Sequence, residues 1–276
     1  MIVLGTLNTL TILRETSVGL FLGDEEGTDI LLPNKYVPLH YDLGDSISVF
    51  CYLDHEERPV ATTLTPFVMR HQFQLLRAVE VNQIGAFMDW GLEKHLFVPY
   101  KEQRQKMIAG QSYVVYCYLD EKSFRLVGSN KIDKFLSNEG LSYPVGTPVS
   151  VLISRKSDLG WDAIIDHKHK GLLYENEVFT PLHVGQETTA YIKHLRPDGK
   201  IDLQLKPMGV EALAPAAELI LSYLADHGGS MPYGDFSTPQ ELQAVFQMSK
   251  KTFKKALGTL YKDKKVTLSP DGTQLI

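Results

Sequence analysis

Apolar and polar residues alternate with a period of two in short runs as far as Leu205, and glycine, proline or acidic residues separate the runs. In an extended strand, successive side chains point to opposite faces, so this pattern predicts short strands buried on one side. After Gly209 the apolar spacing becomes helical. The pattern therefore predicts a long β region followed by a small helical region.

The β region repeats itself three times. A glycine inside an apolar strand marks each copy, at Gly19, Gly85 and Gly160. A second apolar strand opens 11 residues after each glycine, at Ile30, Leu96 and Gly171. Another glycine stands 25 residues after each, at Gly44, Gly110 and Gly185. Such agreement at a fixed spacing is typical of tandem structural units.

Each repeat is expected to form a small five-stranded β-barrel. The strands expected in the first copy are Thr6–Arg14, Val18–Gly23, Asp29–Pro33, Ser46–Leu53 and Val60–Leu64. A loop or helical turn should follow the third strand, at Asn34–Tyr41 and Tyr100–Met107 in the first two copies, and Lys131–Tyr143 should link the second copy to the third. We expect four domains: barrels at 1–66, 67–140 and 141–208, and a helical domain at 209–276.

The C-terminal region reads as a winged helix-turn-helix. An amphipathic helix is expected over Pro215–Asp226, a second starting at Thr238-Pro239, and a third over Lys250–Lys262 after Ser249. The last residues, 266–276, alternate around a Pro-Asp-Gly turn and predict a β-hairpin. Three short helices and a hairpin in this order are typical of a winged helix.

Charge is distributed unevenly along the chain. Residues 1–66 carry 10 acidic and 3 basic side chains, a balance of −7, whereas the balances of 67–140, 141–208 and 209–276 are +2, 0 and 0. An acidic surface repels a phosphate backbone. We therefore expect the first repeat to be dispensable for binding a nucleic acid.

Several functional classes find no support in the sequence. Cys51 and Cys117 stand at equivalent strand positions and are expected to be reduced core thiols, without a zinc-type Cys/His spacing. No phosphate loop or hydrolase motif is present, and carboxylates such as Glu25 and Glu26 are expected on the surface. The absence of a long apolar run or a leader-like start predicts a cytoplasmic protein. We expect no catalytic residue, no metal, no cofactor and no membrane contact.

The repeat resembles the S1 RNA-binding motif, an OB-fold barrel. Gly85-Ala86-Phe87-Met88 matches its first element, and Gly171-Leu172-Leu173-Tyr174 matches its second, with Tyr174 at the position of a stacking histidine. Gly199-Lys200-Ile201 matches its last element. Repeated S1-like barrels followed by a winged helix resemble the conserved virulence factor B family. The resemblance implies a non-catalytic, regulatory, bacterial RNA-binding protein.

The repeats depart from the S1 pattern at three positions. Pro33 and Pro99 stand where the stacking histidine is expected, and Asp162 stands at the third repeat's equivalent of Phe21 and Phe87. We therefore expect at most two repeats to offer an aromatic platform for bases.

The third repeat holds the best mixture of aromatic and basic residues for single-stranded nucleic acid, which needs ring faces for bases and cations along the backbone. The expected site comprises Trp161, Lys168, Lys170, Tyr174, Lys193, Arg196 and Lys200. Its alternative is a solvated hairpin with core aromatics. Phe87 is a second candidate, with a barrel core residue as the alternative. Lys94 and His95 are expected to be plain surface residues.

The third C-terminal helix carries a basic face. Four lysines in pairs spaced four apart form it: Lys250, Lys251, Lys254 and Lys255. Lysines without arginine, asparagine or glutamine at base-reading positions favour backbone contacts over sequence readout. The alternative is a solvated helix face. Only Lys206–Leu213 separates this domain from the third repeat, so one strand of RNA could reach both sites at high effective concentration.

Three functions remain open from the sequence. The first is post-transcriptional regulation by binding single-stranded RNA, since barrels make up most of the chain. The second is transcriptional regulation through DNA binding by the winged helix. The third is an adaptor whose acidic first barrel docks onto a basic protein.

Overall fold

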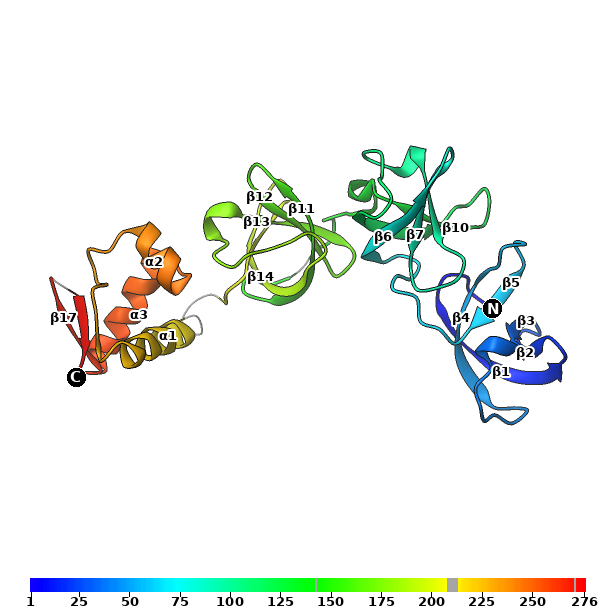
Figure 1. Cartoon of the computed structure of the whole chain (residues 1–276), viewed down its shortest axis with the longest axis horizontal. Coiled ribbons are helices and arrows are strands. Elements are labelled where there is room, and N and C mark those ends of the chain that lie inside the picture. The colour runs from blue at the N-terminus through cyan, green and yellow to red at the C-terminus, as the bar shows by residue number, and fades with distance from the viewer. Residues whose placement is uncertain (142, 208–212, 271) are drawn as a thin grey trace. The chain divides into compact units, whose positions relative to one another are not determined.

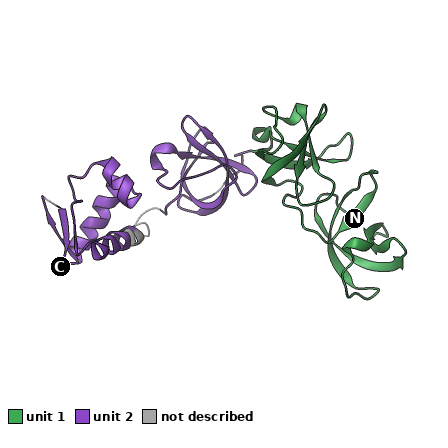
Figure 2. Ribbon diagram, viewed as in Figure 1, with its two compact units in different colours: residues 1–136 green, residues 137–276 purple. Residues whose placement is uncertain are grey.

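A computed structural model of the chain describes residues 1–141, 143–207, 213–270 and 272–276. Three closed five-stranded barrels are followed by a small domain of helices and a three-stranded sheet (Figure 1). The predicted fold class, mainly β with a small α+β domain at the C-terminus, is confirmed. The chain divides into two compact units, Met1–Leu136 and Ser137–Ile276 (Figure 2), while the boundaries of the four expected domains stay predictions.

The three barrels share one topology. The first consists of β1 (Leu7–Thr16), β2 (Gly19–Gly23), β3 (Asp29–Pro33), β4 (Ser46–Leu53) and β5 (Pro59–Thr62). The second consists of β6 (Phe73–Val81), β7 (Gly85–Asp89), β8 (Leu96–Pro99), β9 (Ser112–Leu119) and β10 (Leu126–Ser129). The third consists of β11 (Pro148–Ser157), β12 (Gly160–Ile165), β13 (His169–Tyr174), β14 (Glu187–Leu195) and β15 (Ile201–Gln204). In each, the first strand pairs with the second and fourth, and the fifth closes the barrel between the third and fourth.

The repeated glycine has a steric cause. Gly19, Gly85 and Gly160 open the second strand of their barrels with φ of +149°, +159° and +147°. A Cβ atom at these positions would lie 2.1, 2.4 and 2.1 Å from a carbonyl oxygen of the next strand. Only glycine allows this close approach of two backbones.

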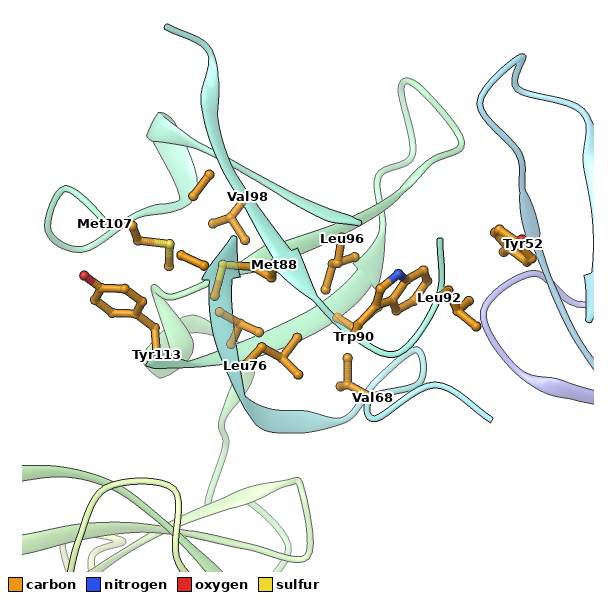
Figure 3. Packing of buried hydrophobic residues seen from close by; sticks show 14 of the residues in the cluster. Tyr52, Val68, Leu76, Met88, Trp90, Leu92, Leu96, Val98, Met107 and Tyr113 are labelled. Carbon is orange, nitrogen blue, oxygen red and sulfur yellow. The ribbon is translucent and has the colours of Figure 1, made fainter. Parts of the chain in front are cut away.

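The first two barrels share part of their hydrophobic core. Tyr52 of the first barrel belongs to the same buried cluster as Trp90 and Leu92 of the second (Figure 3). Phe50 of the first barrel is a member of this cluster too. The rings of Phe50 and Trp90 meet edge to face, with centroids 5.7 Å apart. The first barrel is therefore packed onto the second.

Both cysteines lie in strand interiors, as expected. Cys51 and Cys117 are unbonded and fully buried. Burial raises the pKa of each thiol to about 12, so both are protonated at neutral pH.

The C-terminal domain contains the three expected helices, although the first begins at Leu213 and not at Pro215. The helices are α1 (Leu213–Asp226), α2 (Pro239–Phe246) and α3 (Lys250–Lys262), and the strands are β16 (Ser230–Met231), β17 (Val266–Ser269) and β18 (Gly272–Leu275). Thr238 and Glu241 form a capping box at the start of α2, and Ser249 caps α3. β17 and β18 form the expected hairpin. Residues 208–212, which belong to the expected link after the third barrel, lie outside the described residues.

Two connectors differ from expectation. The turn after β8 is helical only over η2 (Tyr100–Glu102), not as far as Met107. The expected link after the second barrel begins with η3 (Ile132–Phe135), and Phe135 stacks on Tyr116 with ring centroids 4.1 Å apart. That part of the link therefore packs on the second barrel. Within the described ranges, no helix is both long and apolar enough to cross a membrane.

Candidate nucleic-acid interface

The outer face of the third barrel is set by the register of β12, β13 and β15. Leu173 is buried in the barrel core, so its neighbours Leu172 and Tyr174 point outward. Leu172 pairs with Asp162 on one side and with Asp202 on the other. Two acidic side chains thus flank the middle strand on the same face as Tyr174.

A cavity of about 310 Å³ lies on this face. Four of the predicted residues line it together: Lys170, Tyr174, Arg196 and Lys200. Asp162 and Asp202 line the same cavity. The structure therefore gathers one aromatic ring and three cations around two carboxylates.

Asp162 is a buried carboxylate that two cations neutralise. Arg155 donates from Nε to Asp162 Oδ2 at 2.5 Å, and Lys170 Nζ lies 3.3 Å from the same oxygen. A buried carboxylate is tolerated when cations pair with it. The aspartate at this strand position thus replaces an aromatic platform with an ion-paired cluster.

Asp202 orients the Arg196 guanidinium beside Tyr174. Arg196 donates from Nε to Asp202 Oδ2 at 2.9 Å and also donates to the hydroxyl of Tyr174. The hydrogen bond to Asp202 raises the pKa of Arg196 above its ordinary value, so the guanidinium stays charged. The guanidinium carbon lies 5.8 Å from the centre of the Tyr174 ring. The ring and the cation are therefore held together before any ligand binds.

The remaining predicted residues of the third barrel lie apart from this cavity. Trp161 pairs with Leu173 and packs against the barrel core, so its ring is on the opposite face from Tyr174. Lys193 forms an ion pair with Glu177. Lys168 is exposed in the turn before β13. The single groove expected around both Trp161 and Tyr174 is thus not formed by this barrel.

The second barrel offers an aromatic pair. Phe87 alternates with the buried Ala86 and Met88, so its ring faces outward and is half-buried. It packs on Phe97 of β8 with ring centroids 5.1 Å apart and an interplanar angle of 36°. In the first barrel the equivalent ring, Phe21, lies beneath the Arg14 guanidinium at 4.0 Å. The aromatic surfaces therefore differ between repeats.

The basic face of α3 is presented to solvent. Lys251, Lys254 and Lys255 are exposed, and Lys250 is half-buried at the first turn. Lys254 lies 3.4 Å from Asp235, a contact between two exposed groups that contributes little stability. These side chains can therefore turn to a ligand at low cost.

Sequence reasoning missed Arg155, Asp202 and Phe97. Each stands at a strand position whose side chain points outward. Asp202, for example, lies between the buried Ile201 and Leu203. That signal marks an outward side chain, but it gives no partner across strands. Cross-strand register decides the partner.

Comparison with known proteins identifies domain types at both ends of the chain. Residues 218–275 match the CvfB-like winged helix domain, and residues 4–64 match the S1 domain. Both are domain types that bind nucleic acids.

Relatives extend over most of the chain. It is 29% identical to the uncharacterized protein YitL of Bacillus subtilis over 269 residues, 94% of this chain and 89% of YitL. It is 24% identical to conserved virulence factor B of Staphylococcus epidermidis, covering 84% of this chain and 83% of that protein. A crystal structure of a multidomain protein with nucleic acid binding domains from Streptococcus pneumoniae aligns with 26% identity and a TM-score of 0.43, over 99% of this chain and 98% of that one.

Proposed function

We propose that this protein, a relative of the conserved virulence factor B proteins, binds single-stranded RNA and catalyses no reaction on it. The observation that carries the proposal is the cavity of the third barrel. There an outward tyrosine ring stands beside Lys170, Arg196 and Lys200. A ring face for a base with cations for the adjoining phosphates is the combination that single-strand recognition needs.

The winged helix supplies the second support. Its basic face carries lysines, which act as point charges toward phosphates and carry little base specificity. We propose that it extends the contact to the RNA backbone. A protein that binds single strands through stacked bases and backbone phosphates suits post-transcriptional regulation in the cytoplasm.

Duplex DNA binding is a second candidate, favoured by one observation. The lysines lie on α3, which stands in the order of the chain where a winged helix carries its recognition helix. The adaptor function has weaker support, because the first barrel uses part of its surface to pack on the second.

The test is equilibrium binding of labelled oligouridine RNA, single-stranded DNA and duplex DNA at matched ionic strength. We expect oligouridine to bind more tightly than the duplex. Tighter binding of the duplex would reject the proposal in favour of DNA regulation. Matching the salt is essential, because phosphate contacts make all three affinities depend on it.

A further inference from the structure

A second cavity, of about 430 Å³, lies at the junction of the first two barrels. Tyr52, Leu53, His55 and Glu57 line it from the first barrel. Residues of β6, β7, β8, β10 and the loops that join them line it from the second barrel. Its volume is in the range of sites that enclose a small ligand. Tyr52 and Trp90, which line the cavity, also belong to the core that the two barrels share (Figure 3).

Aromatic rings dominate one side of this cavity. The Phe87 and Phe97 pair faces it, and Ile84, 61% exposed, lies beside them. Trp90 also lines it and is fixed, since its indole N–H donates to the Lys94 carbonyl oxygen at 2.6 Å. An aromatic surface of this kind suits a planar ring that packs against one of its faces.

The charges of this cavity favour a base over a phosphate. Its two cations are already engaged: Lys94 donates to the Asp54 carbonyl oxygen at 2.6 Å, and Arg125 pairs with Glu57. Three carboxylates also line the cavity, of which Glu57 pairs with Arg125 and Glu93 pairs with Lys35. The third, Glu80, stands opposite Phe87 in the sheet and accepts a hydrogen bond from Asn82. Burial also lowers the pKa of Lys94. A phosphate would find both cations already engaged, whereas a group that donates hydrogen bonds would find an acceptor in the Glu80 carboxylate.

His95 supplies a polar atom without a partner. Its Nδ1 is buried and, among the residues that the structure describes, has no hydrogen-bond partner. An unpaired buried polar atom is costly, and such atoms are frequent where a ligand binds. His95 lines this cavity, so we correct the expectation that Lys94 and His95 are plain surface residues.

We propose that this two-barrel cavity binds a single guanine base, stacked against Phe87 and Phe97, with its phosphates outside. Among the four bases, guanine presents two adjacent donors on its Watson–Crick edge, N1–H and the N2 amino group, which match a carboxylate. The inference deepens the proposed RNA-binding function and rests on it. The base can belong to a free guanine nucleotide or to a guanosine within an RNA strand, since both present the same edge.

The test compares two labelled RNAs, a short oligouridine and the same oligomer with one central guanosine, on the full-length chain. We expect the guanosine to tighten binding about tenfold, the effect of one good base contact. Phe97→Ala should abolish this preference and leave oligouridine affinity within about twofold, since the third barrel is unaltered. Phe21→Ala removes the first barrel's equivalent of Phe87 and should retain the preference.

Two further measurements distinguish a free nucleotide from an RNA strand as the source of the base, and test binding in a variant that stays folded. In a Trp161→Phe background, Trp90 is the remaining tryptophan, and its fluorescence should change on adding guanosine monophosphate if free nucleotide suffices. A change with the guanosine RNA alone would assign the cavity to a strand. His95→Gln, which keeps a polar side chain in place, should reduce the preference without altering the unfolding transition.

Equal affinity of wild type for both RNAs, with no response of Trp90 to either ligand, would overturn the inference. If oligouridine still binds in the same experiment, the proposed RNA-binding function stands. Loss of binding to every single-stranded RNA would reject the proposed function instead.

Discussion

Tyr174 shows how one residue combines two contributions to the candidate site. Its ring faces outward from β13, while its hydroxyl accepts a hydrogen bond from Arg196. The hydroxyl orients the cation, and the ring offers a stacking face. The two contributions can be separated by substitution.

We expect Tyr174→Ala to weaken oligouridine binding by about 1–3 kcal/mol, the value of one stacked base. Tyr174→Phe keeps the ring and should weaken binding much less. Neither substitution should change the dependence of affinity on salt, because stacking releases no counterions. Fluorescence anisotropy titrations at several salt concentrations measure both quantities. Equal effects of the two substitutions would mean that the hydroxyl, not the ring, contributes the binding energy.

Glu102 contributes pH-dependent stability to the second barrel. Burial acts to raise its pKa, but hydrogen bonds from Lys134 and Ser129 outweigh burial, and its pKa is lowered. A carboxylate with a lowered pKa stabilises the fold above its ordinary pKa, about 4.3, and loses that contribution as pH falls through the folded value.

We expect Lys134→Met to lower the free energy of unfolding at neutral pH by about 1 kcal/mol, since Lys134 is half exposed. The difference from wild type should shrink as the pH falls through the lowered pKa of Glu102, because below it the carboxyl is protonated in both proteins. Lys131→Met, at an exposed lysine nearby, is the control. Urea denaturation across this pH range measures the difference in the free energy of unfolding. A difference that does not change with pH would refute the ion pair of Lys134 with Glu102.

At the scale of the element, α3 concentrates lysines that the fold does not need. We expect replacement of Lys250, Lys251, Lys254 and Lys255 by alanine to weaken RNA binding. The salt dependence should become shallower, by about 0.7 in the logarithmic slope for each phosphate that a lysine no longer neutralises. Replacement of the same four by arginine keeps the charge and should keep the slope. An unchanged slope in the alanine variant would identify this face as solvated surface.

Local sequence patterns predicted most elements, because period-two alternation and capping residues act within a few positions. β3, β4 and α3 begin and end at the predicted residues, and Thr238 and Ser249 cap their helices as expected. Four residues that the sequence grouped, Tyr174, Lys170, Arg196 and Lys200, line one cavity, and their contact with RNA stays a prediction.

What the sequence did not reveal depends on partners distant along the chain. Trp161 and Tyr174 stand on opposite faces because the pairing of Leu173 with Trp161 fixes the register. The salt bridges of Asp162 and the shared core at Trp90 join residues from different strands or barrels. A charge count for the first repeat likewise could not show that its aromatic residues are buried against the second.

At the scale of the molecule, the first barrel stabilises the second. We expect removal of residues 1–66 to expose Trp90 and Leu92 and to destabilise the second barrel by about 3 kcal/mol or more. Chemical denaturation of residues 67–276 beside the full chain measures the difference. Unchanged stability of the second barrel would show that the shared core contributes nothing.

The acidity of the first barrel can be tested without removing the barrel. Glu25→Gln with Glu26→Gln neutralises an exposed turn and should leave the unfolding transition unchanged. RNA affinity should stay equal or rise slightly, since repulsion of phosphates falls.

The most direct test of the central claim is photo-crosslinking of 4-thiouridine-containing oligouridine to the full chain, with the attached peptides mapped by mass spectrometry. The account predicts crosslinks on β13 at or beside Tyr174, which Tyr174→Ala should abolish, together with crosslinks on α3. Crosslinks confined to the first barrel, or none on the outer face of the third, would contradict it.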